Sequence, residues 1–204
     1  MADERCPKVQ GIDVCGYQAQ SIIRVVSWEH QSAMLVANPP VELLKLRNAT
    51  VLQDQDLILS AGAPQALRLP KTFDAIAVDV EVSFELTDSA ARFSVTGFAD
   101  ARNASSGVQV MVSVGEKLAS GARNATMGLR SSGATKAFPV LPSENALHVR
   151  VLIDRSIAEF FVAGGRAVYT TRHYPAPGAA VAVGASARTT AAVAVYEMGC
   201  GWVD

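Results

Sequence analysis

Regular alternation of apolar and polar side chains is the feature that most limits what this chain can fold into. Residues 76–86 alternate without a break, with Ile, Val, Phe and Leu at the even positions. Residues 108–114 repeat the pattern, and residues 147–153 follow it except at Leu152. Because successive side chains of a strand point to opposite faces, this period of two predicts β-strands with one buried face.

Shorter apolar segments extend the pattern over most of the chain. Further strands are predicted at 22–28, 34–37, 57–59, 66–69, 92–98, 125–130, 138–141, 157–162, 166–173, 179–187 and 191–198. Segments rich in Gly, Pro, Asn, Asp and Ser separate them at regular intervals. Many short strands with such spacing predict an all-β fold, an antiparallel sandwich of two sheets.

The stretch from Leu147 to Pro175 is expected to form three strands of an antiparallel meander. Residues 154–156 form a tight polar turn after the first strand, and the pair Gly164-Gly165 is a strong hairpin signal. A two-residue turn at these glycines fixes the register of the hairpin, because every later pair of residues then follows from the first.

That register predicts a specific ion pair. Glu159 is expected to face Thr170, with Arg172 diagonal to it near Ile157. A carboxylate beside apolar neighbours such as Phe161 is partly desolvated and requires a cation. We therefore expect Glu159 to pair with Arg172.

Composition narrows the classes of function. The chain has 204 residues and a net charge of −1. Its length predicts one domain, or one domain with a fragment of another. This charge does not favour binding to nucleic acid or to an anionic membrane surface. No apolar run is long enough for a transmembrane helix, and the first ten residues contain no apolar segment of a signal peptide.

The residues that commonly bind metals are scattered. Cys6, Cys15 and Cys200 have no zinc-site spacing, and the three histidines lie far from them in sequence. We predict neither a metal site nor a cofactor. The thiols are expected to be free or buried, with a Cys6–Cys15 disulfide as the alternative.

Three Asn-x-Ser/Thr motifs, at Asn48, Asn103 and Asn124, are candidate N-glycosylation sites. They suggest secretory or vacuolar ancestry, whereas the N-terminus suggests no signal peptide. The sequence therefore leaves the localisation open.

The 147–175 stretch also resembles the C-terminal β-sandwich of glycoside hydrolase family 32, which includes invertases, inulinases and fructan hydrolases. The signature residues are Asp154, Ser156, Glu159, Gly164, Gly165, Arg166 and Arg172, with further matches at Leu147, Val149, Val151, Phe161, Thr171, Tyr174 and Pro175. The resemblance implies a concanavalin-like jelly roll, similar to lectin folds.

A second match lies near the N-terminus. In the family, the last blade of a catalytic propeller and a linker precede the sandwich; the matching residues here are Gly16, Tyr17, Gln20, Ser21, Arg24, Pro40, Val41, Leu46 and Arg47. The resemblance implies an irregular segment 1–15, a propeller remnant with a linker helix at 16–47, and the sandwich at 48–204. We expect low order in 1–15 and an exposed apolar patch from about 17 to 36, because the remaining blades are not encoded.

No catalytic residue is assigned. The resembled family carries its catalytic carboxylates in Asn-Asp-Pro-Asn, Arg-Asp-Pro and Glu-Cys motifs, and this chain has no Asn-Asp, Arg-Asp or Glu-Cys dipeptide. The two signature carboxylates, Asp154 and Glu159, are expected to be structural, as a turn residue and an ion-pair partner.

The sequence therefore predicts a non-catalytic sandwich that supports a propeller or joins a homo-oligomer, with little activity expected of the chain alone. The alternative is a lectin-like module that binds fructan or sucrose, for which Tyr17, Trp28, Tyr169, Tyr174, Tyr196 and Trp202 are the aromatic candidates.

Overall fold

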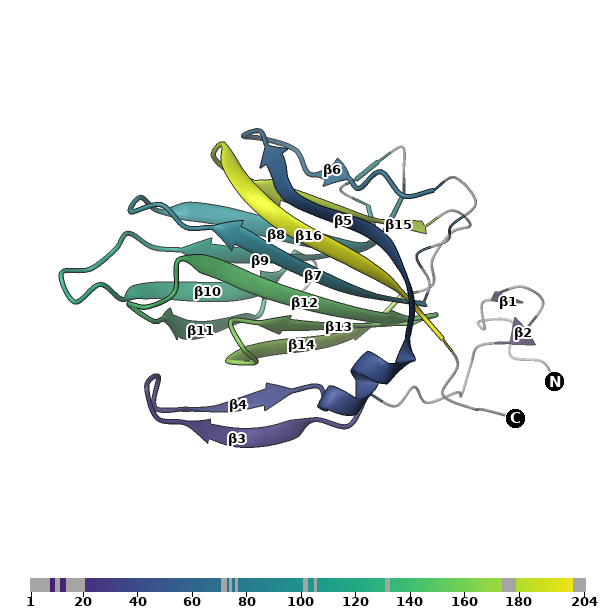
Figure 1. Ribbon diagram of the computed structural model, residues 1–204, viewed down its shortest axis with the longest axis horizontal. Helices are drawn as coiled ribbons and strands as arrows, with labels where there is room; N and C mark the ends of the chain where they lie inside the picture. Colours follow the sequence, from purple (N-terminus) through teal and green to yellow (C-terminus); the bar gives the residue numbers. More distant parts are fainter. Residues whose placement is uncertain are drawn as a thin grey trace.

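The computed structural model of the protein is a sandwich of two six-stranded sheets, with a separate two-stranded hairpin beside it (Figure 1). It describes residues 8–9, 12–13, 21–70, 73, 75, 77–100, 103–104, 106–130, 133–173 and 179–199. All paired strands in both sheets run antiparallel, as the alternating sequence pattern predicts.

Sheet I has the order β11-β10-β9-β8-β15-β6. Its strands are β6 (Gln65–Ala66), β8 (Ala91–Asp100), β9 (Val108–Val114), β10 (Arg123–Leu129), β11 (Thr135–Val140) and β15 (Ala179–Ala185). Sheet II has the order β14-β13-β12-β7-β16-β5. Its strands are β5 (Arg47–Leu59), β7 (Ala77–Glu85), β12 (Ala146–Asp154), β13 (Ile157–Val162), β14 (Ala167–Arg172) and β16 (Thr189–Met198).

The hydrophobic core lies between the inner faces of the two sheets. Valine dominates it, as expected for β-branched residues on a pleated surface, and the rings of Phe84 and Phe93 meet across the sheets with centroids 4.8 Å apart. Phe160 and Val151 are fully buried in this core. Inward side chains from all of the long strands thus fill the space between the two sheets, as the alternation of apolar and polar residues predicted.

Among the described residues, five shorter elements precede the sandwich. The strands β3 (Val25–Glu29) and β4 (Met34–Asn38) form the N-terminal hairpin, and a 3₁₀ helix η1 (Val41–Leu46) joins it to β5. A further pair, β1 (Lys8–Val9) and β2 (Ile12–Asp13), lies nearer the N-terminus. The predicted low order of 1–15 falls largely on residues outside the described ranges.

The predicted linker helix is present as η1, a six-residue 3₁₀ helix with no buried residue. A 3₁₀ helix has about three residues per turn, so it makes about two turns. The bounds of two expected strands need correction, and the strand expected at 66–69 is the two-residue β6. The short strand expected at 57–59 is the end of the 13-residue β5, whose register against β16 shifts three times and hides the alternation.

The register of the 157–172 hairpin is as predicted. Glu159 pairs with Thr170, Ile157 with Arg172, and Phe160 with Tyr169. At the turn, Gly164 and Gly165 have φ angles of 64° and 84°. Positive φ at both central residues is the requirement of a type I′ turn, which glycine meets without steric strain.

Candidate docking surface

The outer face of sheet II carries most of the signature residues and contacts the N-terminal hairpin and η1. Side chains on β13 alternate, so that Phe160 points into the core and its neighbours Glu159 and Phe161 point outward. Glu159 and Phe161 are nonetheless buried, since the N-terminal segment covers this part of the sheet. We refer to the contact between the outer face of sheet II and residues 21–47 as the outer layer.

Glu159 is the centre of the first polar contact in the outer layer. Its side chain is only 2% exposed. One carboxylate oxygen accepts a 2.6 Å hydrogen bond from the backbone N–H of Ile22, and the other accepts from Arg24 Nη2 at 2.6 Å and from Thr170 Oγ1 at 3.1 Å. The carboxylate therefore binds the segment just before β3.

This arrangement corrects the predicted Glu159–Arg172 pair. The strand register behind that prediction is right, but the salt bridge of Glu159 is with Arg24. The reason is that residues 22–24 cross directly over the outward carboxylate, whereas Arg172 lies diagonal to it, beside Ile157. Arg24 was among the matched positions near the N-terminus, but sequence alone did not place it 135 positions away, against β13.

Arg166 forms the second polar contact, between the hairpin and the loop before β12. Its Nε and Nη2 donate to both oxygens of Glu29 at 2.5 and 2.9 Å, and its Nη1 donates to both oxygens of Glu144 at 2.9 and 2.8 Å. The hydrogen bonds from Arg166 hold the pKa of Glu29 below its usual value despite partial burial. Burial tends to lower the pKa of Arg166, but the two carboxylates outweigh it and the pKa lies above the ordinary value.

Asp79 forms the third polar contact, where the linker enters the sandwich. Arg150 binds Asp79 through two hydrogen bonds of 2.9 and 2.7 Å, and Arg47 Nε donates to it at 2.7 Å. Arg47 also bonds to Glu81 and lies 3.8 Å from the ring centroid of Tyr196. A planar guanidinium is suited to such stacking combined with hydrogen bonding.

The alternation in β7 predicted Asp79 to be on a solvent-facing position. The structure confirms that it faces outward, yet it is fully buried beneath Arg47 and Arg150. Sequence reasoning therefore missed this group. One signal was present in the sequence: the outward positions Arg47 and Arg150 are positively charged, and Asp79 is negatively charged. Whether these three side chains meet depends on how β5, β7 and β12 pair, which the local pattern does not show.

The signature turn is the contact point for β4. The N–H of Ala37 donates to the carbonyl of Gly165 at 3.0 Å, and Asn38 Nδ2 donates to the carbonyl of Gly164 at 2.9 Å. A Cβ atom on Gly165 would lie 2.5 Å from the carbonyl oxygen of Ala37. The second glycine thus allows the two backbones to approach closely, in addition to forming the turn.

Apolar contacts complete the outer layer. Ile22, Ala37 and Leu43 pack against a small cluster of Leu152, Phe161 and Val168 on sheet II. The guanidinium of Arg24 lies 5.6 Å from the ring centroid of Phe161, within the range of a cation–π contact. One side of the N-terminal segment therefore packs against the outer face of sheet II.

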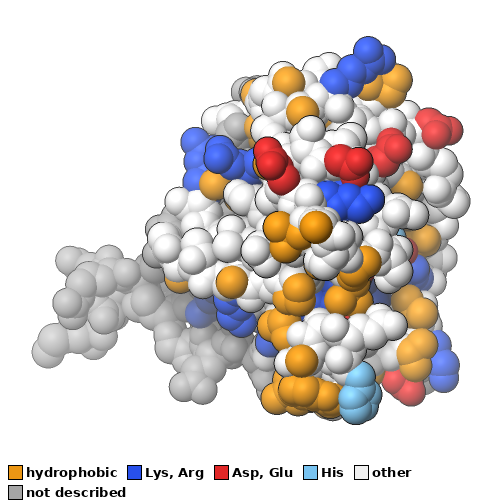
Figure 2. Space-filling view, turned by 90° about the vertical axis from the view of Figure 1, so that its left-hand side faces the viewer, with side chains coloured by type: hydrophobic (Ala, Val, Ile, Leu, Met, Phe, Trp, Pro, Cys, Tyr) orange, Lys and Arg blue, Asp and Glu red, His pale blue; other side chains and the backbone are white. Residues whose placement is uncertain are grey.

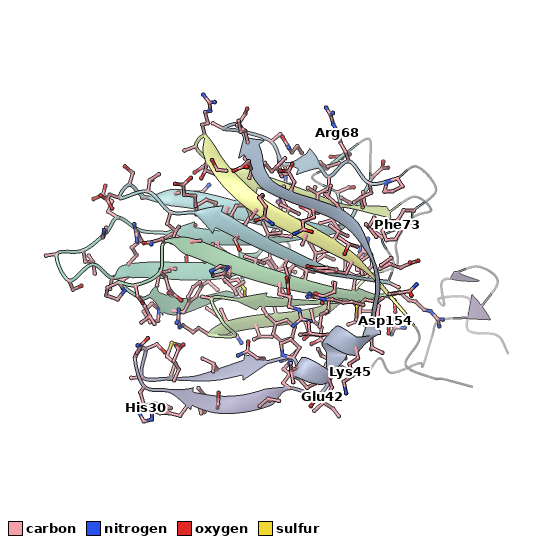
Figure 3. The ribbon with its side chains drawn as sticks, viewed as in Figure 1. His30, Glu42, Lys45, Arg68, Phe73 and Asp154 are labelled. Atoms are coloured by element: carbon pink, nitrogen blue, oxygen red, sulfur yellow. The ribbon has the colours of Figure 1, made fainter. Side chains whose placement is uncertain are left out.

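Much of the rest of that segment is apolar and exposed, as predicted, but Val36 is buried and residues 17–20 of the predicted patch lie outside the described ranges. The exposed fractions are 78% for Ile23, 54% for Val25, 60% for Val26, 52% for Trp28 and 64% for Leu35, with Val41 at 69% on η1. Hydrophobic side chains gather in the lower part of Figure 2, where the hairpin lies. Figure 3 shows His30 at the tip of the hairpin and Glu42 and Lys45 on η1, at its opposite end. We call the exposed residues 23, 25, 26, 28, 35 and 41 the apolar patch.

The remaining predicted residues do not form a reactive site. Asp154 is exposed at the turn between β12 and β13, away from the polar contacts described above, and Figure 3 places it toward the η1 end of the sheet. The carbonyl of Ser156 accepts a hydrogen bond from the N–H of His173 at 2.8 Å. His148 is outward and exposed, as expected, with Nδ1 2.7 Å from Ser83 Oγ. In the part of the chain that the structure describes, no group of acidic, His or Cys side chains could hold a metal ion.

The three candidate glycosylation asparagines are all exposed. Asn48 lies in β5, with Nδ2 3.3 Å from an oxygen of Glu197, and Asn124 lies in β10. Asn103 lies in the loop between β8 and β9. The three cysteines lie outside the described residues, so the Cys6–Cys15 disulfide stays a prediction. Within the described ranges, no helix is long and apolar enough to span a membrane.

Comparison with known proteins agrees with the β-sandwich fold described above. A family model described as the C-terminal domain of glycosyl hydrolases family 32 matches residues 42–197. Fructan 1-exohydrolase IIa from Cichorium intybus is similar in structure, with a TM-score of 0.67 and 18% identity, over 86% of this chain and 40% of that one. No curated protein matches the chain.

Two further solved structures share the fold. For exo-inulinase from Aspergillus awamori the TM-score is 0.56 at 17% identity, over 88% of this chain and 35% of that one. For a Bombyx mori beta-fructofuranosidase mutant in complex with sucrose the TM-score is 0.53 at 16% identity, over 88% of this chain and 32% of that one. The chain thus spans 40% or less of the length of each of these three proteins.

Proposed function

The chain belongs to glycosyl hydrolase family 32, as its C-terminal β-sandwich domain, and we propose that it acts as a non-catalytic support for a catalytic propeller. In this proposal residues 16–47 form the last part of the propeller and the linker, and residues 48–204 form the supporting sandwich. The active sites that cleave sucrose or fructan would then lie entirely on the partner.

The apolar patch is the observation that carries this proposal. One side of the hairpin is fixed to sheet II by Glu159, Arg166 and the Gly164-Gly165 turn, while the other side leaves several large apolar side chains exposed. Large apolar side chains exposed together on one element are typical of a site of interaction with another protein. A rigidly held, uncovered apolar surface is what a supporting domain presents to the domain it supports.

The carboxylates of the sandwich argue for a non-catalytic role. A retaining glycosidase needs two carboxyl groups about 5–5.5 Å apart, one to attack the sugar and one to protonate the leaving group. Both oxygens of Glu159 already accept hydrogen bonds from the N-terminal segment, and Asp154 is an exposed turn residue. Neither is arranged to reach a glycosidic bond in a pocket.

An activity assay on the purified chain tests the catalytic half of the proposal. We expect no release of fructose from sucrose or inulin, because the loss of both a nucleophile and an acid removes the means of cleaving the bond. Release of fructose at enzymatic rates that is abolished by Asp154→Asn or Glu159→Gln would refute the proposal.

The supporting role is tested by binding to a family 32 catalytic domain from the same genome, co-expressed with the chain. We expect the two to co-purify, and we expect Trp28→Lys together with Leu35→Lys to abolish this, because both changes place charge within the apolar patch. Leu118→Lys is the matched control, since Leu118 is 48% exposed on the loop between β9 and β10, outside the patch. Equal binding by both variants would contradict the role of the patch.

A groove favours the second candidate function, fructan binding. It has a volume of about 410 Å³ and lies between sheet II, the end of β4 and η1, with Glu81, Ser83 and His148 among its polar lining. Of the aromatic candidates within the described ranges, none lines it: Trp28 lies on the hairpin, Tyr169 on β14, and Arg47 covers the ring of Tyr196. Titration calorimetry with inulin and sucrose tests this function, and absence of heat would exclude it.

A further inference from the structure

A groove crosses the outer face of sheet I, on the opposite side of the sandwich from the outer layer. Its volume is about 510 Å³, within the range of small-molecule sites. Residues of β8, β9 and β10 line it together with Ser186, and every lining residue belongs to the described ranges. The groove lies where β8 begins and β9 ends, at the end of the sandwich that Figure 1 shows away from both chain termini.

Three polar side chains form a row along this groove. Thr126 of β10 lies opposite Ser113 of β9, and Ser113 lies opposite Arg92 of β8. Residues paired in this way share one face of the sheet. Farther along the same face, Gln109 donates to the hydroxyl of Thr96 at 3.3 Å. The three side chains of the row, by contrast, have no hydrogen-bond or ion-pair partner in the part of the chain that the structure describes.

Asn124 lies at one end of the groove, beside the row. It precedes Thr126 by two positions in β10, so both side chains leave the same face of the sheet, and both are exposed. Its neighbour on the β9 side is Gly115, whose N–H donates to the carbonyl of Asn124 at 2.8 Å and which has no side chain to fill the space. The small residues Ala90 and Ala91 continue the lining toward β8. The space beside Asn124 is therefore open along the row of polar side chains.

We propose that Asn124 is an N-glycosylation site and that the first sugars of its glycan lie in this groove, against Ser113 and Arg92. Asn124-Ala125-Thr126 is an Asn-x-Thr motif. Adjacent strands lie about 4.8 Å apart, so the groove runs roughly 10 Å from β10 to β8. Sugar hydroxyls both donate and accept hydrogen bonds, which matches a lining that offers a guanidinium donor and serine and threonine hydroxyls.

The modification joins Asn124 Nδ2 to the anomeric carbon of the first sugar. The donor is an oligosaccharide carried on a polyprenyl pyrophosphate, and the oligosaccharyltransferase of the secretory pathway transfers it. The bond between the anomeric carbon and the pyrophosphate oxygen breaks as the bond to Nδ2 forms. The amide nitrogen loses one proton, and the polyprenyl pyrophosphate leaves with the electron pair of the broken bond.

The lining favours an attached glycan over a free sugar. A free ligand must offset its lost translational and rotational freedom, usually through apolar and aromatic contacts. No aromatic side chain lines this groove. A covalently attached sugar is held at a high effective concentration, so a few hydrogen bonds are enough to keep it in place. The glycan would extend from the face opposite the outer layer, and the inference does not rest on the supporting function.

Translation of the full chain behind a signal peptide, in the presence of microsomes, tests the modification. Asn48→Gln and Asn103→Gln together leave Asn124 as the only Asn-x-Ser/Thr motif. We expect this chain to gain the mass of a single glycan, which Asn124→Gln or Thr126→Ala should abolish and Thr126→Ser should retain. Cleavage of the signal peptide in the same sample shows that the chain entered the microsomes. A translocated chain without a glycan, or a glycan that persists after Asn124→Gln, would overturn the proposal.

The rate at which a peptide-N-glycosidase removes the glycan from the folded chain tests its position in the groove. Sugars bound to Arg92 are protected from the enzyme. Arg92→Ala should therefore accelerate removal roughly tenfold, as expected when a hydrogen bond to a charged group is lost. Arg68→Ala is the matched control, because Arg68 is an exposed arginine after β6 and outside the groove. Circular dichroism checks that both variants are folded. Equal rates for the parent chain and Arg92→Ala would refute the position of the glycan in the groove.

Discussion

The core between the two sheets and the outer layer beneath the hairpin are both buried, but they are built differently. The core is almost entirely apolar, with Val, Phe and Ala from both sheets. The outer layer contains three of the six buried polar or charged side chains among the described residues, namely Asp79, Glu159 and Arg166. An apolar core supplies stability in proportion to its volume and area, whereas buried ion pairs contribute little net stability but allow few alternative arrangements. The core therefore holds the domain together, and the outer layer determines where the hairpin sits.

Adjacent phenylalanines provide the largest and most direct test of this difference. Phe160 lies in the core and Phe161 in the outer layer. We expect Phe160→Ala to lower the free energy of unfolding by about 3–5 kcal/mol, as for other buried Phe residues. Phe161→Ala should cost less and should loosen mainly the hairpin, because the smaller cluster can collapse into the space.

Urea denaturation measures the global effect of each change, and amide exchange at residues 22–38 measures the local one. If both substitutions lowered global stability equally and left the exchange of the hairpin unchanged, the outer layer would be part of the same cooperative core.

The next largest effect is expected at Asp79. Asp79→Asn removes the buried charge that two partly exposed arginines share, and breaking a buried pair typically costs about 3 kcal/mol or more. Asp154→Asn is the control, because Asp154 is an exposed carboxylate on the same sheet, and such surface changes usually stay within about 0.5 kcal/mol. Thermal unfolding of the two variants measures the difference, and similar melting temperatures would contradict a central role for Asp79.

The two signature glycines separate turn formation from hairpin docking. Gly164→Ala should cost only the strain of positive φ, about 1 kcal/mol, because a Cβ there meets nothing within 4 Å. Gly165→Ala adds a clash with the backbone of Ala37 and should cost about 2–3 kcal/mol. Only the second change should also accelerate amide exchange at Ala37. Equal exchange in the two variants would show that the close approach is unimportant.

Low pH should weaken the contact between the hairpin and the sandwich, and we expect this to change stability less than any of the substitutions above. Because its hydrogen bonds to Arg166 lower the pKa of Glu29 in the folded chain, this contact stabilises the fold fully above the pKa of an unfolded Glu. The contribution is lost as the pH falls through the lowered folded value. Trp28 on the same strand should report this as an acid-dependent fluorescence change, which Glu29→Gln should remove. High salt should weaken the contact as well, since Glu29 is partly exposed.

The core and the outer layer also differ in how well sequence predicts them. Alternation at 76–86 and 108–114 identified the strands and their inward residues, because that pattern is local. The glycine pair fixed the pairing of Glu159 with Thr170 for the same reason. The partner of Glu159 was predicted wrongly, because the choice of Arg24 over Arg172 depends on a segment distant in sequence that crosses the sheet. The burial of Asp79 was missed because it depends on side chains from two other strands.

The junction between η1 and β5 has a mechanical consequence. Residues 39–46 consist of two prolines and a 3₁₀ helix, and Arg47 immediately after them is held by Asp79, Glu81 and the ring of Tyr196. A connection with so few free backbone torsions and a fixed end is rigid, so the hairpin cannot rotate independently of the sandwich. Whatever is joined to the hairpin will therefore keep a fixed angle to the sandwich and tumble with it as a single body. The junction therefore fixes the orientation of the hairpin relative to the sandwich, whereas a flexible linker in its place would limit only the distance between them.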